Sequence, residues 1–395
     1  MEQTLTTAIQ QNNYEALSTL FSSTPSPTSW LSLGQGEQRT LAALFIKLSI
    51  TTPTFLPQAF ASPHALEAIH KALGHLPTSV EQAYDNQLRH LLFAYLVEEE
   101  DDYRAAANVL AGCRMEDVDD TSVYYISPQD KTDIYVKIAE CFLNEEDISE
   151  ADSFVTKAGS AVQNIAEPSQ HVALILRYKT CYARVLDLNR KFLQAATRYH
   201  ELSLVGSKTD IVHAEELLEF LGKAATCAIL APRTAQCQRI LGLVYKDERL
   251  GMLDAIPKFQ THSAIVTKMY MNQVIRREEE LKTFEESLAE HQTAIMGDGL
   301  TILDRALIEH NMVSASRLYA SIYFTNLAHL LGVSAERAEK VASKMIMDGS
   351  LEGSIDQVEG LLNFQAQKQA LVNWDDSITS FCLQLNRVTD AVRQV

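Results

Sequence analysis

The sequence has few glycines, 15 in 395 residues. Glycine supplies the unusual backbone angles of tight turns and phosphate-binding loops, so an α/β enzyme of this length would normally contain more. The nucleotide-binding strings G-x-G-x-x-G and G-x-x-x-x-G-K-[ST] and the hydrolase string G-x-S-x-G do not occur. Gly34 and Gly36 lack a third glycine and a preceding strand. The composition therefore favours long helices joined by short connections.

The chain also lacks an excess of positive charge. Its 34 Lys and Arg against 51 Asp and Glu give a formal net charge of −17. Nucleic-acid binding relies on cations that displace condensed counterions, so this charge argues against DNA or RNA. No apolar run approaches the roughly 20 residues that span a bilayer, and the first residues lack the basic and apolar parts of a secretory signal. We expect a soluble intracellular protein with no membrane or nucleic-acid partner.

Motifs for catalysis and metal binding are missing as well. The six cysteines form no C-x-x-C pair and mostly lie in helical apolar patterns, which predicts buried thiols rather than disulfides or zinc ligands. The eleven histidines form no H-x-H, H-E-x-x-H or H-x-x-E-H string. Glu309, His310 and Asn311 are expected at a helix end, with the histidine in a structural role. The sequence thus predicts no catalytic residues, no metal site and no cofactor.

Helical patterns fill the first part of the chain. Residues 1–80 hold six of the ten prolines, which predicts a segment of short helices such as 40–48 and 65–73. Residues 81–290 are predicted to form an α-solenoid of three or four helix pairs. The second helix of each pair begins with a bulky residue followed three positions later by alanine, at intervals of 44 to 45 residues: Tyr103 and Ala106, Ile148 and Ala151, Phe192 and Ala195. Small alanines let antiparallel helices approach closely, while the first helices supply bulk from Leu92, Leu96, Phe142, Leu143, Tyr182 and Leu186.

Charged stretches mark several of the connections. The acidic runs at 98–102 and 116–120 are predicted to be solvated loops, with a partner-steering acidic patch as the alternative. Residues 258–291 are predicted to form a long helix with a charged middle. Helices at 302–310 and 313–319 should follow, separated from it by the glycines at 297 and 299.

Residues 291–370 are predicted to form a winged helix. A short aromatic strand at 321–324 precedes a helix ended by Gly332, a second helix from Ala335 to Asp348, and a β-hairpin of 351–355 with 361–364. The charged residues of the second helix sum to zero and the wing is acidic, which argues against DNA and favours contact with protein through the sheet edge. The residues predicted to bind partners there are Ile322, Tyr323, Phe324, Ile355, Leu361 and Phe364.

Residues 371–395 carry a heptad pattern typical of a helix that packs among other helices. Its apolar residues recur at alternating steps of four and three, which places all of them on one seam: Trp374, Ile378, Phe381, Leu385, Val388 and Val392. We expect this seam to bind other chains. The alternative is that it folds back onto the core of the same chain.

Helical repeats, a winged helix and a terminal helix, in that order, resemble the PCI family shared by the proteasome lid, the COP nine signalosome and translation initiation factor three. Within it the chain is most similar to the subunit-four family of the signalosome. The strings that carry the resemblance are YKTCYARVLD at 178–187, RKF at 190–192, YKDER at 245–249, ILDRA at 302–306, IEHN at 308–311 and GSIDQVEG at 353–360.

The resemblance implies a non-catalytic scaffold subunit of a complex that deneddylates cullin-RING ubiquitin ligases. Its expected partners are the other PCI subunits, the metalloprotease pair and the cullin-RING ligase, the last through the solenoid arm. Its expected location is the cytoplasm and nucleus. Two alternatives stay open: the paralogous PCI subunit of the proteasome lid and, from a different class, a winged-helix nucleic-acid-binding protein.

Overall fold

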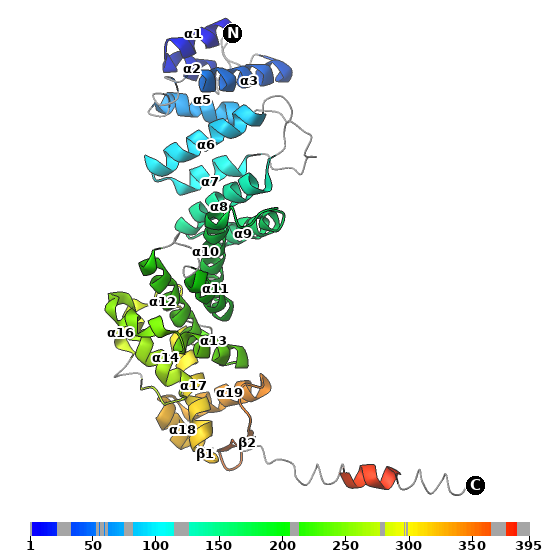
Figure 1. The fold of residues 1–395 in the computed structure, drawn as a ribbon, viewed down its shortest axis with the longest axis vertical. Coiled ribbons are helices and arrows are strands. Elements are labelled where there is room, and N and C mark those ends of the chain that lie inside the picture. Colours follow the sequence, from blue (N-terminus) through cyan, green and yellow to red (C-terminus); the bar gives the residue numbers. More distant parts are fainter. Residues whose placement is uncertain are drawn as a thin grey trace, which may run out of the picture. The chain divides into compact units, whose positions relative to one another are not determined.

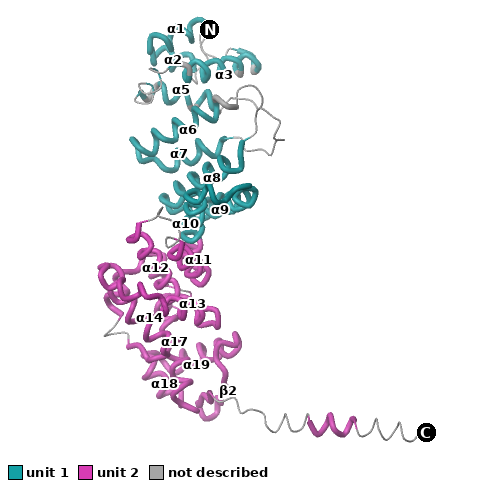
Figure 2. Tube along the Cα trace, in the orientation of Figure 1, with its two compact units in different colours: residues 1–185 teal, residues 186–395 magenta. Residues whose placement is uncertain are grey.

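The protein is described by a computed structural model that covers residues 2–21, 33–52, 55, 59, 62–74, 82–113, 126–205, 213–276, 281–295, 297, 299–364 and 377–384. The chain divides into two compact units, residues 1–185 and 186–395 (Figure 2). Helices dominate both units, and in the described part of the chain the strands form one small sheet (Figure 1). The predicted fold class is confirmed. No helix within the described ranges is both long enough and apolar enough to cross a bilayer.

The first unit consists of consecutive packed helices. They are α1 (Glu2–Gln10), α2 (Tyr14–Leu20), α3 (Gln35–Thr51), α5 (Pro63–Gly74), α6 (Gln82–Glu98), α7 (Tyr103–Ala111), α8 (Pro128–Asn144), α9 (Ile148–Gln163) and most of α10 (Val172–Leu188). Phe45 lies at the centre of the N-terminal core, with its ring centroid 5.1 Å from that of Phe21 and 6.4 Å from that of Phe55. α3 and α5 are longer than predicted. Pro63 occupies the first position of α5, where a helix needs no N–H donor.

The predicted helix pairs are confirmed. The helices α7, α9 and α11 (Phe192–Val205) begin at the three bulky residues that the repeat indicated, and the three alanines are fully buried. The acidic run at 98–102 is exposed in the turn between α6 and α7, whereas the run at 116–120 lies outside the described residues. Residues in left-handed conformation make these turns without glycine: φ is 59° at both Glu146 and Arg190. The next amide then donates to a carbonyl five residues earlier, Asp147 N to Phe142 O at 3.0 Å.

The second unit continues the helical packing from the end of α10. Its helical elements are α11, α12 (Ala214–Leu230), α13 (Ala235–Tyr245), the 3₁₀ helices η2 (Glu248–Ala255) and η3 (Pro257–Phe259), α14 (His262–Tyr270), α16 (Lys282–Ser287), α17 (Ile302–Leu318), α18 (Phe324–Leu331) and α19 (Ala335–Met347). The helices α11, α12 and α13 pack against one another, and α14 packs against α12 and α13.

The predicted long helix at 258–291 is wrong. The structure has α14 and the short α16 instead, with residues 271–276 outside any helix. Asn272 adopts φ 53° and ends α14. Beyond α16, the buried Gln292 amide donates to both carboxylate oxygens of Asp187 at 3.1 and 3.2 Å, which holds the chain in a loop.

The two helices predicted at 302–310 and 313–319 are one helix, α17. Glu309, His310 and Asn311 therefore lie inside the helix rather than at its end, which corrects the prediction. Thr301 and Asp304 form a capping box at its start, because each side chain accepts from the backbone N–H of the other residue. No helix-breaking residue interrupts the pattern after them.

The predicted winged helix is confirmed in outline. Its strands are β1 (Ser321–Tyr323), β2 (Ser354–Asp356) and β3 (Leu361–Asn363), ordered β1-β3-β2 and antiparallel throughout. Gly332 ends α18 with φ 68°, and Gly349 follows α19 with φ 69°. Gly353 passes so close to the β3 backbone that a Cβ there would lie 2.6 Å from Asn363 O. Gly332 makes the turn between α18 and α19, and Gly349 and Gly353 lie in the connection from α19 to the wing.

Candidate assembly surfaces

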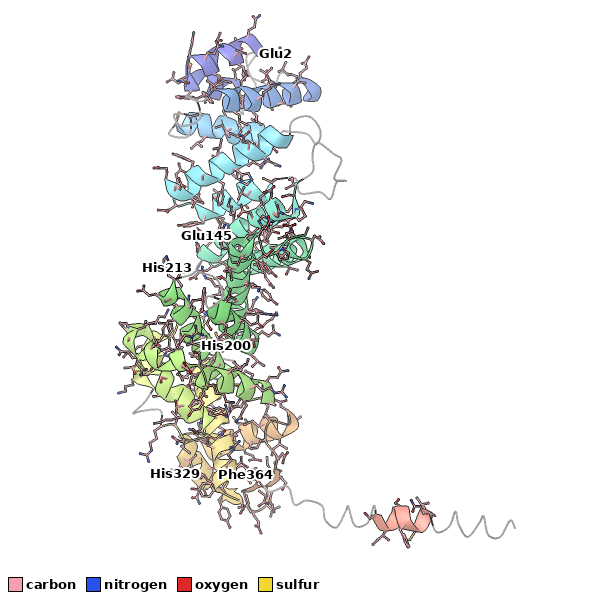
Figure 3. All side chains as sticks on the ribbon, in the orientation of Figure 1. Glu2, Glu145, His200, His213, His329 and Phe364 are labelled. Carbon is pink, nitrogen blue, oxygen red and sulfur yellow. The ribbon has the colours of Figure 1, made fainter. Side chains whose placement is uncertain are left out.

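The sheet of the winged helix has two edge strands, β1 and β2, because β3 lies between them. The outer edge of β1 has no strand partner in the described part of the chain. Tyr323 is 52% exposed, and Ile355 and Leu361 are half-buried. Ile322, Phe324 and Phe364 are buried in the core of the winged helix; Phe364 ends the described part of this subdomain (Figure 3). Of the six residues predicted here, only Tyr323, Ile355 and Leu361 therefore present surface.

The wing is bound to the helix behind it. Gln357 Nε2 donates to Glu339 Oε1 at 2.9 Å, which links the β2–β3 turn to α19. Within the turn, the Asp356 carboxylate accepts from the amides of Val358 and Glu359. Val358 stands at the tip of the wing and is 97% exposed. The wing thus combines fixed acidic groups with one apolar side chain in solvent.

The terminal seam lies only partly within the described residues. Residues 377–384 form a helix in which every residue is exposed, including Ile378 at 45% and Phe381 at 63%. Leu383, on a different side of the heptad pattern, is 58% exposed. The other predicted seam residues lie outside the described residues: Trp374, Leu385, Val388 and Val392.

A buried polar network fixes the segment before the winged helix, and the sequence interpretation missed it. Asn311 on α17 accepts from Ile275 N and donates to Ile275 O, each at 2.9 Å. His310 Nε2 donates to Gln273 O at 2.8 Å. Polar residues in succession on a buried helix were the available signal, because buried amides and imidazoles require partners.

Arginine and glutamate extend this network to the end of α12. The Glu309 carboxylate accepts from Arg233 N at 3.2 Å and from Arg305 Nε at 3.0 Å. Arg233 is 5% exposed, and its Nη2 donates to Asn272 Oδ1 at 3.0 Å. Hydrogen bonds of charged groups in a buried site are stronger than exposed ones, so this node holds α17 firmly against the α12–α13 connection.

Two buried imidazoles and two buried thiols are held in their neutral forms. Burial lowers the pKa of His262 and His310 to about 4, and raises the pKa of Cys113 and Cys181 to about 12. Five cysteines are buried free thiols, as predicted, and Cys382 is an exposed free thiol. Across the described ranges, no group of three or more His, Cys, Asp or Glu side chains is arranged to hold a metal ion. The described interior is therefore built for packing.

Two protein families match the chain in separate regions. The PCI domain matches residues 262–366, and the family described as PSMD12/CSN4, N-terminal, matches residues 78–211. The chain is 38% identical over 313 residues to COP9 signalosome complex subunit 4 of Dictyostelium discoideum, which covers 78% of this chain and 74% of that protein. The subunit 4 proteins of Drosophila melanogaster and Arabidopsis thaliana are 39% and 37% identical, over 78% and 76% of this chain and 72% of each relative. The chain belongs to the COP9 signalosome subunit 4 family.

This result confirms the resemblance read from the sequence. The family at the N-terminal side is named for both PSMD12 and CSN4, whereas the relatives that match over 76% to 78% of this chain are subunit 4 proteins. The PCI match begins at the first residue of α14 and so includes the winged helix and all of the buried network except Arg233. Membership in the subunit 4 family therefore accounts for both the helical repeats and the PCI domain.

Proposed function

We propose that the chain is a non-catalytic scaffold subunit of a COP9 signalosome, the assembly named in its relatives. Through that complex it would take part in deneddylating cullin-RING ligases, in the cytoplasm and nucleus. The proposed partners are the other PCI subunits and the metalloprotease pair, with the helical repeats contacting the ligase. The observation that carries the assembly role is the helix at 377–384, which exposes Ile378 and Phe381 on the predicted seam and Leu383 on another side.

The energetics favour a partner for this helix. Burial of one large apolar side chain contributes about 1.5 to 3 kcal/mol, and an isolated helix of two turns is not stable in water. Packing Ile378 and Phe381 among other helices would therefore supply much of the free energy that holds the subunit in place. The open edge of β1, with Tyr323 exposed beside it, is the second proposed contact, formed by strand addition.

The test is truncation before residue 373, followed by co-purification with the other subunits. We expect the truncated chain to remain folded, as judged by its melting temperature, and to be lost from the complex. The paired change Ile378→Ser with Phe381→Ser should weaken assembly by several kcal/mol, whereas Thr379→Ser with Ser380→Ala, at exposed positions of the same helix, should not. A truncated chain that melts much lower yet still assembles would mean that the seam packs on its own core.

Absence of catalysis is tested separately. The purified chain should have no isopeptidase activity and should contain no stoichiometric zinc, because the sequence has no H-x-H or H-E-x-x-H ligand set. Elemental analysis that finds about one zinc per chain would contradict this proposal. The chain should also fail to bind duplex DNA at moderate salt.

A further inference from the structure

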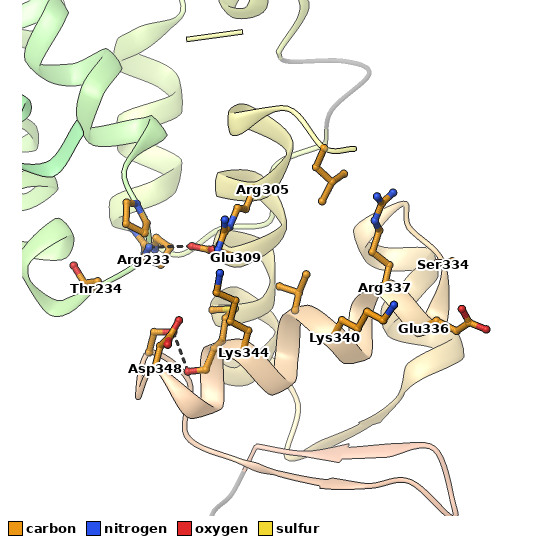
Figure 4. A pocket seen from close by; sticks show the side chains of 15 residues that line it. Arg233, Thr234, Arg305, Glu309, Ser334, Glu336, Arg337, Lys340, Lys344 and Asp348 are labelled. Atoms are coloured by element: carbon orange, nitrogen blue, oxygen red, sulfur yellow. Dashed lines mark hydrogen bonds and ion pairs between the residues drawn. The ribbon is translucent and has the colours of Figure 1, made fainter. Parts of the chain in front are cut away.

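A pocket of about 540 Å³ lies in the second unit, between the α12–α13 connection, α17 and α19 (Figure 4). The helix α19 is the one that a winged helix would use to read DNA. Its charged residues are not evenly distributed around it. The row Arg337, Lys340 and Lys344 lines the pocket, whereas Glu339 binds the wing residue Gln357. The helix therefore has one cationic face, which its small net charge does not reveal.

The lining of the pocket is cationic within an acidic protein. It includes five basic and three acidic side chains, a formal charge of +2, whereas the whole chain carries −17. Of the acidic side chains, Glu309 is already engaged by Arg305, whereas Glu336 and Asp348 line the pocket beside the basic residues. Lys340 and Lys344 are exposed and have no ion-pair partner in the part of the chain that the structure describes. A negatively charged ligand would gain most from these two lysines.

The spacing of the cations suits an extended peptide. Arg337, Lys340 and Lys344 are spaced i, i+3 and i+7, so they span about 10 Å along one face of α19. In an extended chain, side chains on one side recur about every 6.8 Å. Two or three acidic side chains of a short extended segment would therefore reach the three cations together.

The apolar side chains that line the pocket favour a peptide over a polyphosphate as its ligand. Leu300, Val341 and Met345 line the pocket beside the lysines. A phosphate chain or a nucleic acid would leave these surfaces without a match, whereas a peptide can place an apolar side chain between its acidic ones. The wall formed by α17 and residues 232–234 faces the cationic row of α19, so a duplex could not lay a groove over it.

We propose that this pocket binds an acidic peptide segment of a partner protein, with an apolar side chain between its carboxylates. The site deepens the proposed scaffold function by giving the chemistry of one docking partner. This proposal rests on the proposed scaffold function, because the peptide would belong to a partner in the same complex. Binding can be measured on the full-length chain alone, so its outcome is separate from that of the assembly experiment.

The test is fluorescence anisotropy with a fluorescein-labelled Glu-Glu-Leu-Glu-Glu peptide and, as the matched control, Gln-Gln-Leu-Gln-Gln. We expect saturable binding of the acidic peptide that weakens as salt is raised. Changing both Lys340→Glu and Lys344→Glu should weaken binding by about tenfold or more, since two charge-assisted contacts are reversed. Lys179→Glu, the same change at an exposed position of α10, should alter affinity by no more than about twofold.

A third variant separates the peptide from other anions. Val341→Thr keeps the side-chain shape but replaces one methyl group by a hydroxyl, so it should weaken binding of the leucine-containing peptide and leave competition by inorganic tripolyphosphate unchanged. Melting curves for each variant confirm that it is folded. The proposal is overturned if tripolyphosphate or duplex RNA binds more tightly than the peptide, or if the lysine variants and Lys179→Glu behave alike.

Discussion

Replacing Asn311 tests whether the buried network holds the segment before the winged helix. Asn311 is 3% exposed and forms both of its hydrogen bonds with the backbone of Ile275. Asn311→Ala would leave the N–H and the C=O of Ile275 buried without partners. Each such group costs about 1 to 3 kcal/mol, so the loss should be about 2 to 6 kcal/mol for the second unit. Asn311→Asp should also destabilise, since it places a carboxylate beside a carbonyl oxygen.

Two measurements check this result. Urea unfolding followed by circular dichroism gives the loss of stability, and amide hydrogen exchange of residues 272–276 gives its location, because those amides should exchange more than about tenfold faster. Asn326→Ala, the same substitution at an exposed position of α18, is the matched control and should change stability by less than about 0.5 kcal/mol. If Asn311→Ala and Asn326→Ala unfold at the same urea concentration, the segment is held by packing alone and the reasoning is refuted.

Three further predictions concern stability and protonation. Glu146→Gly should stabilise the chain by about 1 kcal/mol in urea unfolding, because φ is 59° there, whereas Glu145→Gly, at φ −84°, should not stabilise it. Lys191→Asp should stabilise the chain by about 0.5 to 2 kcal/mol and so raise its melting temperature. The carbonyl oxygen of Lys191 accepts the first hydrogen bond of α11, which makes residue 191 the N-cap, and an aspartate side chain can accept from the free amides there whereas a lysine side chain cannot. His262 and His310, with pKa values of about 4, should give imidazole NMR signals that do not titrate between pH 7.5 and 5. These pKa values lie below those of histidine in the unfolded chain, so the stability that the two neutral rings contribute should fall as the pH drops from about 6.5 to 4.

Local signals predicted the fold where local forces determine it. The repeat predicted the starts of α7 and α9 at Tyr103 and Ile148, and in the structure the carboxylates of Asp102 and Asp147 cap these helices by accepting from the amide three residues on. The turn before α19 follows from Gly332 at positive φ. In each case the decisive partners lie within a few residues, so the sequence pattern contains the whole interaction.

Prediction failed where distant partners decide the backbone. Residues 258–291 carry a charged pattern typical of a helix, yet Ile275 is held by Asn311, 36 positions away, and Gln292 by Asp187, 105 positions away. The same limit applies to the partner-binding residues. The pattern placed Ile322 and Phe364 at the sheet edge, but the pairing of β1 with β3 turns both into the core of the winged helix. Tyr323, the neighbour of Ile322, points outward because side chains alternate along a strand.

The charge on α19 shows why a sum over a helix is a weak guide to what the helix binds. The charged residues of the predicted helix 335–348 sum to zero, which argued against DNA, and α19 itself carries a net charge of +1 because Asp348 lies just beyond its end. The packed structure instead divides the helix by direction: Ala338, Ala342 and Met345 face the core, Glu339 faces the wing, and Lys340 and Lys344 face the pocket. A ligand that enters the pocket therefore meets the cations without the acid on the wing side. Because an α-helix has 3.6 residues per turn, the direction of each charged side chain of α19 follows once the buried face of the helix is known. That buried face is fixed by the packing of α19 against α17 and α18.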